Sequence, residues 1–422
     1  MMRRAPTPVS PVRVLTGLLL AAAVLVPVFA GCAPKRDGGA DGPIVVWVQM
    51  DPDEKARFDR NLEAWRAAHP GTTIDVLTFD TENLRQQFQT QAAAGAGPDL
   101  LFGPSDQVGP LSLVKLLRPL DTTMPAGFFD SFLPASLDTL DGHLWQAPDQ
   151  IGNHLMLLYN RKLLPEPPTT HDELVAAGRR LTSKAGTPDA RYGFVMNTSE
   201  PYWLAPYLGG FGGWVLDAAR KPTLDTPAMV AALRYLRSLR DEAGIMPREA
   251  DYQVSETLFK EGRAAMIVNG PWSIGGYRSA GIDLGVAPLP RLPNGNWPQP
   301  MIASKGYSIS INVAEAKLPR VIELVAFLTG SEAQRRDVAK LGFFPSDASA
   351  FGDSLLAADP VLAGARDALA RGRRMPVVPE MRVIWDAMRP NLQDVMNGAK
   401  SPENAARDMQ AAAVAQIATL AE

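Results

Sequence analysis

Three short apolar segments of the chain are separated by two segments with helical periodicity. The apolar segments are residues 44–48 (IVVWV), 74–78 (IDVLT) and 100–102 (LLF). Between them, apolar residues recur every three or four positions, first as Phe58, Leu62 and Trp65 and then as Leu84 and Phe88. This β-α-β-α-β order predicts an α/β fold with a mostly parallel sheet covered by helices.

The remaining sequence continues this alternation, and its length of 422 residues predicts two domains. Further strands are expected at 155–159, 263–267 and 307–311, and helices at 170–181, from Pro227 to Gly244, at 321–328 and at 405–420. The helix at Pro227 has a capping candidate directly before a proline at its first turn. By contrast, the run Gly209–Gly213 is expected to be a turn, because it lacks the Lys-Ser/Thr of a phosphate loop.

The N-terminus has the pattern of an export signal. Two arginines precede an apolar run from Val14 to Ala30, which ends beside Cys32, the only cysteine. The stretch Phe29-Ala30-Gly31-Cys32 resembles the cleavage box of bacterial lipoproteins, in which the cysteine is acylated. We therefore predict a lipoprotein signal peptide at 1–31, lipidation of Cys32 and a lipid-anchored tether at 32–43. A plain signal peptide and an uncleaved anchor are the alternatives.

Composition and motifs exclude several classes of protein. A formal net charge of −3 gives no basic surface for nucleic acid. With one cysteine there is no disulfide, so the mature chain depends on core packing. We find no phosphate loop, no nucleophile elbow and no zinc helix, and the four histidines are not at metal-ligand spacing. The sequence therefore predicts neither an enzyme nor a cofactor or metal, although a glycosidase carboxylate pair assembled in space stays open.

Aromatic residues lie beside polar ones on three predicted turns. The clusters are Glu200-Pro201-Tyr202-Trp203, Asn269-Gly270-Pro271-Trp272, and Met375-Pro376 together with Trp385 and Arg389. Sugars require this mixture, because their C–H faces stack on aromatic rings and their hydroxyls bond to carboxylates, amides and guanidinium groups. Each aromatic residue taken alone could equally belong to the core, but three clusters on turns favour a sugar site.

The chain resembles the extracellular solute-binding proteins of ABC importers (family 1), and in particular the maltose/maltodextrin-binding proteins. The likeness runs in order from Val46 to about Ala413. The matching stretches are 94–100 (AGAGPDL), 158–165 (LYNRKLLP), 200–202 (EPY), 259–266 (FKEGRAAM), 269–272 (NGPW), 375–376 (MP) and 385–389 (WDAMR). The resemblance implies a two-lobed periplasmic-binding-protein fold of the class II type, with a ligand cleft between lobes joined by hinge crossovers. It places 44–152 plus 305–351 in the N-terminal lobe and 153–304 plus 352–422 in the C-terminal lobe.

The resemblance also implies which residues bind carbohydrate. They are Asp51, Asp106, Asn153, Glu200, Tyr202, Trp203, Trp272, Met375, Trp385 and Arg389. Departures from the family pattern are Pro52 for a lysine, Gly103 for a tryptophan, Gln107 for an arginine, Asn153 for an acid and Asp386 for a tyrosine. Most of these losses fall on the first lobe, so we expect a rebuilt wall there and a preferred sugar that need not be maltose.

The predicted function is capture of a di- or oligosaccharide and its delivery to ABC permease subunits with a cytoplasmic ATPase. Maltose or maltodextrin, trehalose and sucrose or another α-glucoside are all open as ligands. We expect an exported, lipid-anchored monomer in the bacterial envelope. The alternatives are a same-fold binder of a polyamine or phosphate ester, an envelope glycan-acting enzyme and a signalling receptor.

Overall fold

The computed structural model describes residues 42–420 except 337, 339–341 and 353–357. Cys32, the predicted signal peptide and most of the tether lie outside the described residues.

The larger sheet has the strand order β12-β6-β11-β3-β1-β2, with β13 paired to β11. Its strands are β1 (Ile44–Val48), β2 (Ile74–Thr78), β3 (Leu100–Pro104), β6 (Ala147–Gly152), β11 (Met301–Ile309), β12 (Phe344–Pro345) and β13 (Arg373–Arg374). β1 runs parallel to both β2 and β3, whereas β11 runs antiparallel to β3 and β6. The predicted parallel β-α-β-α-β unit is therefore confirmed. The expectation of a mostly parallel sheet is wrong, because β6, β11 and β12 pair with their neighbours mainly in antiparallel fashion.

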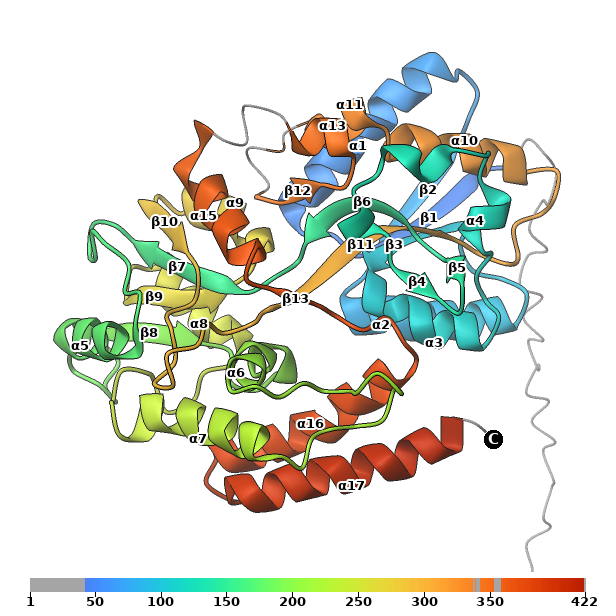
Figure 1. Cartoon of the computed structure of the whole chain (residues 1–422). Coiled ribbons are helices and arrows are strands. Elements are labelled where there is room, and N and C mark those ends of the chain that lie inside the picture. Colours follow the sequence, from blue (N-terminus) through green and yellow to red (C-terminus); the bar gives the residue numbers. More distant parts are fainter. Residues whose placement is uncertain (1–41, 337, 339–341, 353–357, 421–422) are drawn as a thin grey trace, which may run out of the picture. The chain divides into compact units, whose positions relative to one another are not determined.

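A second sheet has the order β10-β7-β9-β8. Its strands are β7 (Met156–Asn160), β8 (Tyr192–Met196), β9 (Ala264–Asn269) and β10 (Leu284–Ala287), and a separate small hairpin is formed by β4 (Thr139–Leu140) and β5 (His143–Leu144). β8 and β9 are parallel, so both end on the same edge of this sheet. The two sheets occupy different parts of the ribbon in Figure 1.

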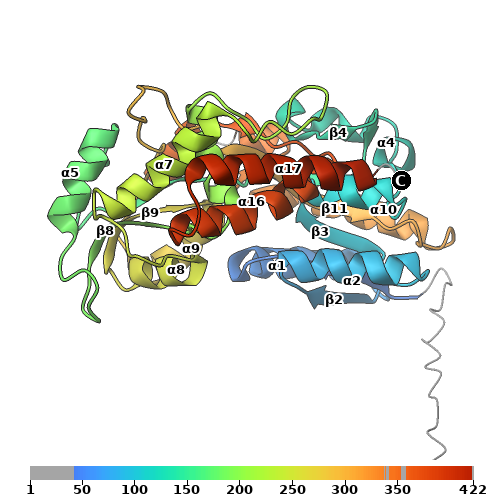
Figure 2. The same ribbon diagram turned by 90° about the horizontal axis from the view of Figure 1, so that it is seen from below.

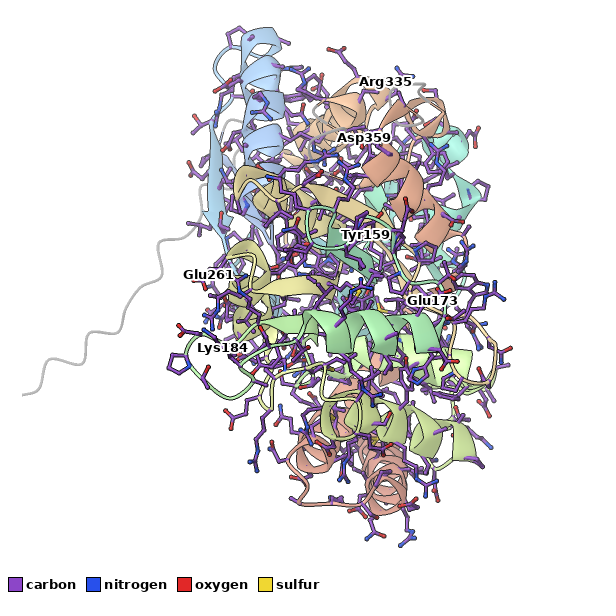
Figure 3. All side chains as sticks on the ribbon, turned by 90° about the vertical axis from the view of Figure 1, so that its left-hand side faces the viewer. Tyr159, Glu173, Lys184, Glu261, Arg335 and Asp359 are labelled. Carbon is purple, nitrogen blue, oxygen red and sulfur yellow. The ribbon has the colours of Figure 1, made fainter. Side chains whose placement is uncertain are left out.

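Helices follow most of these strands. The longer ones are α1 (Pro52–Ala68), α2 (Thr81–Ala93), α5 (His171–Leu181), α7 (Pro227–Asp241), α8 (Tyr252–Lys260), α10 (Leu318–Leu328), α15 (Pro360–Leu369), α16 (Glu380–Met396) and α17 (Pro402–Leu420). The shorter ones are α3 (Val108–Leu113), α4 (Leu120–Thr123), α6 (Ala205–Gly210), α9 (Ile274–Ser279), α11 (Ser331–Arg335), α13 (Ala348–Phe351), η1 (Ser105–Gln107), η2 (Phe128–Ser131), η3 (Pro134–Ser136), η4 (Pro201–Trp203) and η5 (Pro271–Ser273). α16 and α17 lie side by side in Figures 1 and 2. Figure 3 looks onto α5, with Glu173 in the helix and Lys184 in the loop beyond its end.

Local capping fixes where the first two helices begin. Asp51 caps α1, since its side chain accepts hydrogen bonds from the backbone N–H groups of Asp53 and Glu54, and Glu54 accepts one from the Asp51 N–H. Asp80 caps α2 in the same way through the N–H of Asn83. Both caps satisfy N–H groups that have no partner inside the helix. They also place a carboxylate just beyond the end of β1 and of β2.

The prediction of a turn at Gly209–Gly213 is wrong for its first two residues, which end α6. Both are buried, and a Cβ atom would lie 2.8 Å from the Cβ of Gln299 at Gly209 and 2.6 Å from the Cδ1 of Leu292 at Gly210. Glycine thus serves close packing here, which outweighs its low helix propensity. The strand expected at 307–311 is β11, which begins earlier, at Met301, and ends at Ile309.

The proposed lobe boundaries fall on two paired strands. The first follows Gly152, the last residue of β6, and the second precedes Lys305 within β11. These strands pair antiparallel, with a register irregularity between Lys305 and Gly306. The boundaries themselves stay a prediction.

Gly306→Ala tests how closely β6 and β11 approach. An added Cβ would lie 2.1 Å from the carbonyl oxygen of Ala147, so the strands must separate. We expect the free energy of unfolding to fall by about 1–3 kcal/mol in urea denaturation, as for other overpacked sites. Gly276→Ala in α9 is the matched control, because its nearest neighbour is Lys260 Cε at 3.5 Å. Equal free energies of unfolding for the two variants would contradict the claim that β6 and β11 leave no room for a side chain at position 306.

Candidate functional site

A cavity of about 880 Å³ lies where strands of both sheets end. Segments that follow β1, β2 and β3 line one side of it, and segments that follow β8 and β9 line the other. In open α/β sheets, ligands bind at the carboxyl ends of parallel strands, because loops and helix N-termini meet there. The topology therefore makes this cavity the candidate site.

The two sides differ in chemistry, and we call them the first wall and the second wall. The first wall consists of Gln49, Met50, Asp51, Glu54, Thr78, Phe79, Asp80, Thr81, Glu82, Pro104, Asp106 and Lys305. The second wall consists of Asn153, Glu200, Pro201, Tyr202, Trp203, Tyr252, Trp272, Met375, Trp385 and Arg389. All ten residues predicted to bind carbohydrate are among these, so the structure brings them together; their roles stay a prediction.

The second wall contains a group of aromatic rings that contact one another edge to face. Ring centroids are 6.4 Å apart for Trp203 and Trp272, 5.8 Å for Tyr202 and Trp203, and 6.3 Å for Tyr202 and Trp385. The Trp203 indole N–H donates to the Val268 carbonyl at 2.9 Å, which fixes that ring from behind. T-shaped contacts of this kind fix the rings relative to one another.

The turn after β9 presents Trp272 to the cavity. Asn269 ends the strand, and its amide donates to the Glu256 carboxylate at 2.7 Å and to the Tyr277 hydroxyl at 2.8 Å. The next residue is Gly270, and a larger residue would not fit there, because a Cβ atom would lie 2.0 Å from the Trp272 ring. The Trp272 indole N–H in turn donates to the Tyr252 hydroxyl at 3.2 Å. The turn formed by Asn269, Gly270 and Pro271 thus holds the half-buried indole of Trp272 at the end of the buried strand β9.

Helix α16 carries charged side chains that pair with cavity residues, and of these Arg389 lines the cavity itself. Arg389, one turn after Trp385, donates through Nε to both oxygens of Glu200 at 3.0 and 3.1 Å. Arg382 donates to Asp386 at 2.9 Å and to both oxygens of Glu82 at 2.6 and 2.7 Å. Because Glu82 lies in α2, this ion pair joins a first-wall helix to a second-wall helix.

A buried ion pair lies at the base of the first wall. Lys305 donates to both oxygens of Glu54 at 2.8 Å, and both residues are almost fully buried. Burial is the largest influence on Glu54 and alone would raise its pKa. The charge and hydrogen bond of Lys305, together with hydrogen bonds from the Asp51 N–H and Gln150, outweigh burial, so the pKa is lowered. Burial and the negative charge of Glu54 raise the pKa of the adjacent Asp51 to about 7. The cation thus neutralises Glu54 and leaves Asp51 only partly compensated.

Asp106 is the second carboxylic acid with a shifted pKa. Burial, assisted by the charge of Glu82, raises its pKa to about 6, while a hydrogen bond from Trp385 acts in the opposite direction. Its Oδ1 atom is buried and has no hydrogen-bond partner among the described residues. An uncompensated buried acceptor is costly, and a ligand hydroxyl would satisfy it.

Sequence reasoning missed several cavity residues. Gln49 and Phe79 directly follow β1 and β2, so the rule that ligands bind at strand ends could have indicated them. Lys305 could have been noticed as a charge within an apolar strand. Of the departures from the family pattern, Gly103 and Gln107 lie outside the cavity, beside a void of about 10 Å³.

Neither metal chemistry nor a membrane span is indicated for residues that the structure describes. Among them, no three His, Cys, Asp or Glu side chains group closely enough to hold a metal ion. Within the same residues, every helix is too short or too polar to cross a bilayer.

Asp51→Asn tests the environment of this carboxyl group. The folded pKa of about 7 exceeds the ordinary value of 3.8 for an aspartate, so the stability associated with protonated Asp51 is lost as the pH rises from about 4 to 7. Asparagine caps helices as well as aspartate does. We expect the variant to have a higher melting temperature than the wild type at pH 8, with the gap narrowing as the pH falls below 7 and closing only near pH 4.

Asp80→Asn is the matched control, because Asp80 caps α2 but its pKa is lowered by hydrogen bonds from Asn83. Its melting temperature at pH 8 should not rise. A pH-independent difference between Asp51→Asn and the wild type would contradict the raised pKa.

Comparison with known proteins gives consistent results. The family model described as "Bacterial extracellular solute-binding protein" matches residues 51–335. A maltotriose-binding protein of Pyrococcus abyssi is 28% identical over 85% of this chain and 78% of its own length. A maltooligosaccharide ABC transporter solute-binding lipoprotein of Streptococcus pneumoniae is 24% identical over 94% of both chains.

Solved structures extend the likeness to three dimensions. The maltose/maltodextrin-binding domain of Bdellovibrio bacteriovorus, bound to maltotriose, matches with a TM-score of 0.85 and 37% identity, over 89% of this chain and 99% of that chain. A Thermus thermophilus maltotriose-binding protein matches with a TM-score of 0.80 and 26% identity, over 89% and 100%. The predicted two-lobed α/β fold is confirmed. Since the family model covers more than half of the sequence, the chain belongs to the bacterial extracellular solute-binding proteins, which are binding proteins and not enzymes.

Proposed function

We propose that this chain is the solute-binding component of an ABC importer and captures a di- or oligosaccharide in the cavity between the two walls. The observation that carries the proposal is the aromatic second wall, with Tyr202, Trp272 and Trp385, opposite the carboxylates of Asp51 and Asp106. Pyranose rings present an apolar C–H face and a rim of hydroxyls, which match rings and carboxylates respectively.

The size of the cavity supports a ligand of a few sugar units. Its volume of about 880 Å³ lies in the upper part of the usual range for small-molecule sites. Relatives named for maltotriose and maltooligosaccharides support the α-glucoside class. Arg389 and Glu200 would contribute donors and acceptors to the ligand, and Asp106 a buried acceptor without a partner among the described residues.

The proposal includes export and anchoring. Cys32 would carry the lipid and residues 32–43 the tether, and a relative named as a lipoprotein supports this. The protein would work as a monomer that delivers its ligand to the membrane permease. Radiolabelled palmitate incorporated by the wild type but not by Cys32→Ser would support the anchor, and equal labelling would contradict it.

Isothermal titration of the exported protein with maltose, maltotriose, trehalose, sucrose and spermidine tests the function. Trp272→Ala and Trp385→Ala should each weaken saccharide binding by about ten-fold or more, because each removes a stacking surface worth upwards of about 1.4 kcal/mol. Trp297→Ala is the control, since Trp297 lies outside the cavity against Arg371 and Arg291. Binding of spermidine with no heat from any sugar would overturn the proposal.

A further inference from the structure

Aromatic side chains are distributed unevenly over the two walls. Six aromatic residues line the cavity, and five of them belong to the second wall: Tyr202, Trp203, Tyr252, Trp272 and Trp385. Among the described residues, the first wall contributes Phe79 alone. A sugar lying on the second wall would therefore meet one aromatic ring on its opposite side.

Phe79 is fixed in place from behind. It directly follows β2, and its backbone N–H donates to the Val48 carbonyl at 2.9 Å, which continues the pairing with β1. Its ring contacts the indole of Trp47, with centroids 4.8 Å apart and planes inclined by 43°. Trp47 is only 4% exposed, so the ring has a rigid support. Phe79 itself is half-buried and lines the cavity.

A polar residue, Gln49, holds the equivalent position at the end of the neighbouring strand. Gln49 follows β1 as Phe79 follows β2, and the last residues of the two strands, Val48 and Thr78, are register partners. The Oε1 atom of Gln49 is buried and has no hydrogen-bond partner among the described residues. Buried polar atoms normally have a hydrogen-bond partner. We therefore expect a ligand hydroxyl to donate a hydrogen bond to this oxygen. Met50 and Asp80 also line the cavity here.

Gly103, at the corresponding end of β3, does not leave room for a second aromatic side chain on the first wall. At Gly103, at the end of β3, a Cβ atom would lie 3.1 Å from Gln107 Oε1 and 3.4 Å from Leu84 Cδ2. These side chains fill the space beside Gly103, and the remaining void measures about 10 Å³. Among the described residues that line the first wall, Phe79 is therefore the one that offers an aromatic contact.

We propose that Phe79 stacks on the C–H face of a sugar ring and that Gln49 accepts a hydroxyl of the same ring, so that this unit contacts both walls. The inference rests on the proposed saccharide function and adds a specificity-determining residue to it. A ligand held between Phe79 and the second wall links elements of both sheets, so Phe79 stabilises the arrangement in which the walls are close.

Maltotriose is the probe, and the full-length protein is titrated with it by calorimetry. Phe79→Leu keeps an apolar side chain without a flat aromatic face, and Phe79→Tyr keeps the ring. We expect Phe79→Leu to weaken binding about five- to ten-fold and Phe79→Tyr to stay within about two-fold of the wild type. Gln49→Met should also weaken binding, with a less favourable enthalpy.

Leu77→Ala is the matched control, because Leu77 lies in β2, two residues before Phe79, is 50% exposed and does not line the cavity. The melting temperature of each variant shows whether it is still folded. If Phe79→Leu has the melting temperature of the wild type, a loss of maltotriose binding in this variant is due to the lost aromatic ring and not to unfolding. Wild-type affinity in both Phe79→Leu and Phe79→Ala would overturn the inference while leaving the saccharide function intact. A wild-type protein that binds neither maltotriose nor the other sugars would overturn the proposed function itself, and the inference with it.

Discussion

Two buried ion pairs join helix α1 to strands β6 and β11 of the larger sheet. Lys305 of β11 binds Glu54 of α1, and Arg57 of the same helix binds Asp149 of β6. Gln150 adds a hydrogen bond to Glu54 at 2.6 Å. Removing one partner of such a pair leaves an uncompensated buried charge, which costs about 3–5 kcal/mol. The base of the cavity is therefore specified by charge pairing as well as by apolar packing.

The same cluster determines the electrostatics of the site. α1 can begin at the end of β1 only because Asp51 caps it, and the cap places a carboxylate in a cavity that already contains Glu54. Lys305 neutralises Glu54, so the negative charge that the first wall retains belongs to Asp80, whose pKa is lowered, and in part to Asp51 and Asp106, whose pKa values are raised. A fixed, poorly solvated carboxylate is a strong acceptor when ionised, and neutral hydroxyls can satisfy it without bringing a counter-charge.

Much of the fold could be predicted from the sequence, because its elements are strongly patterned. The starts of α1, α5 and α7 follow from Asp51, Thr170 and Thr226, which cap them in the structure. Gly209 and Gly210 could not be placed correctly, since their reason is contact with Gln299 and Leu292, about 80 to 90 positions away in the chain. Local patterns contain no information on such contacts.

The candidate site was predictable on the second wall and less so on the first. Trp272 and Trp385 stand in distinctive motifs, and turn chemistry around Asn269 and Gly270 explains why an indole lies at a strand end. Phe79 stands in no motif. Its place in the cavity depends on the parallel pairing of β1 with β2 and on the support of Trp47. Both are consequences of the assembled sheet.

The ion pair between Arg382 and Glu82 has a consequence for the ligand-free protein. It joins α16 of the second wall to α2 of the first wall. Both side chains are partly exposed, and ions in solution screen such a pair over about 8 to 10 Å at moderate ionic strength. Salt in the surrounding medium therefore weakens the link between α16 and α2, and with it part of what holds the two walls together.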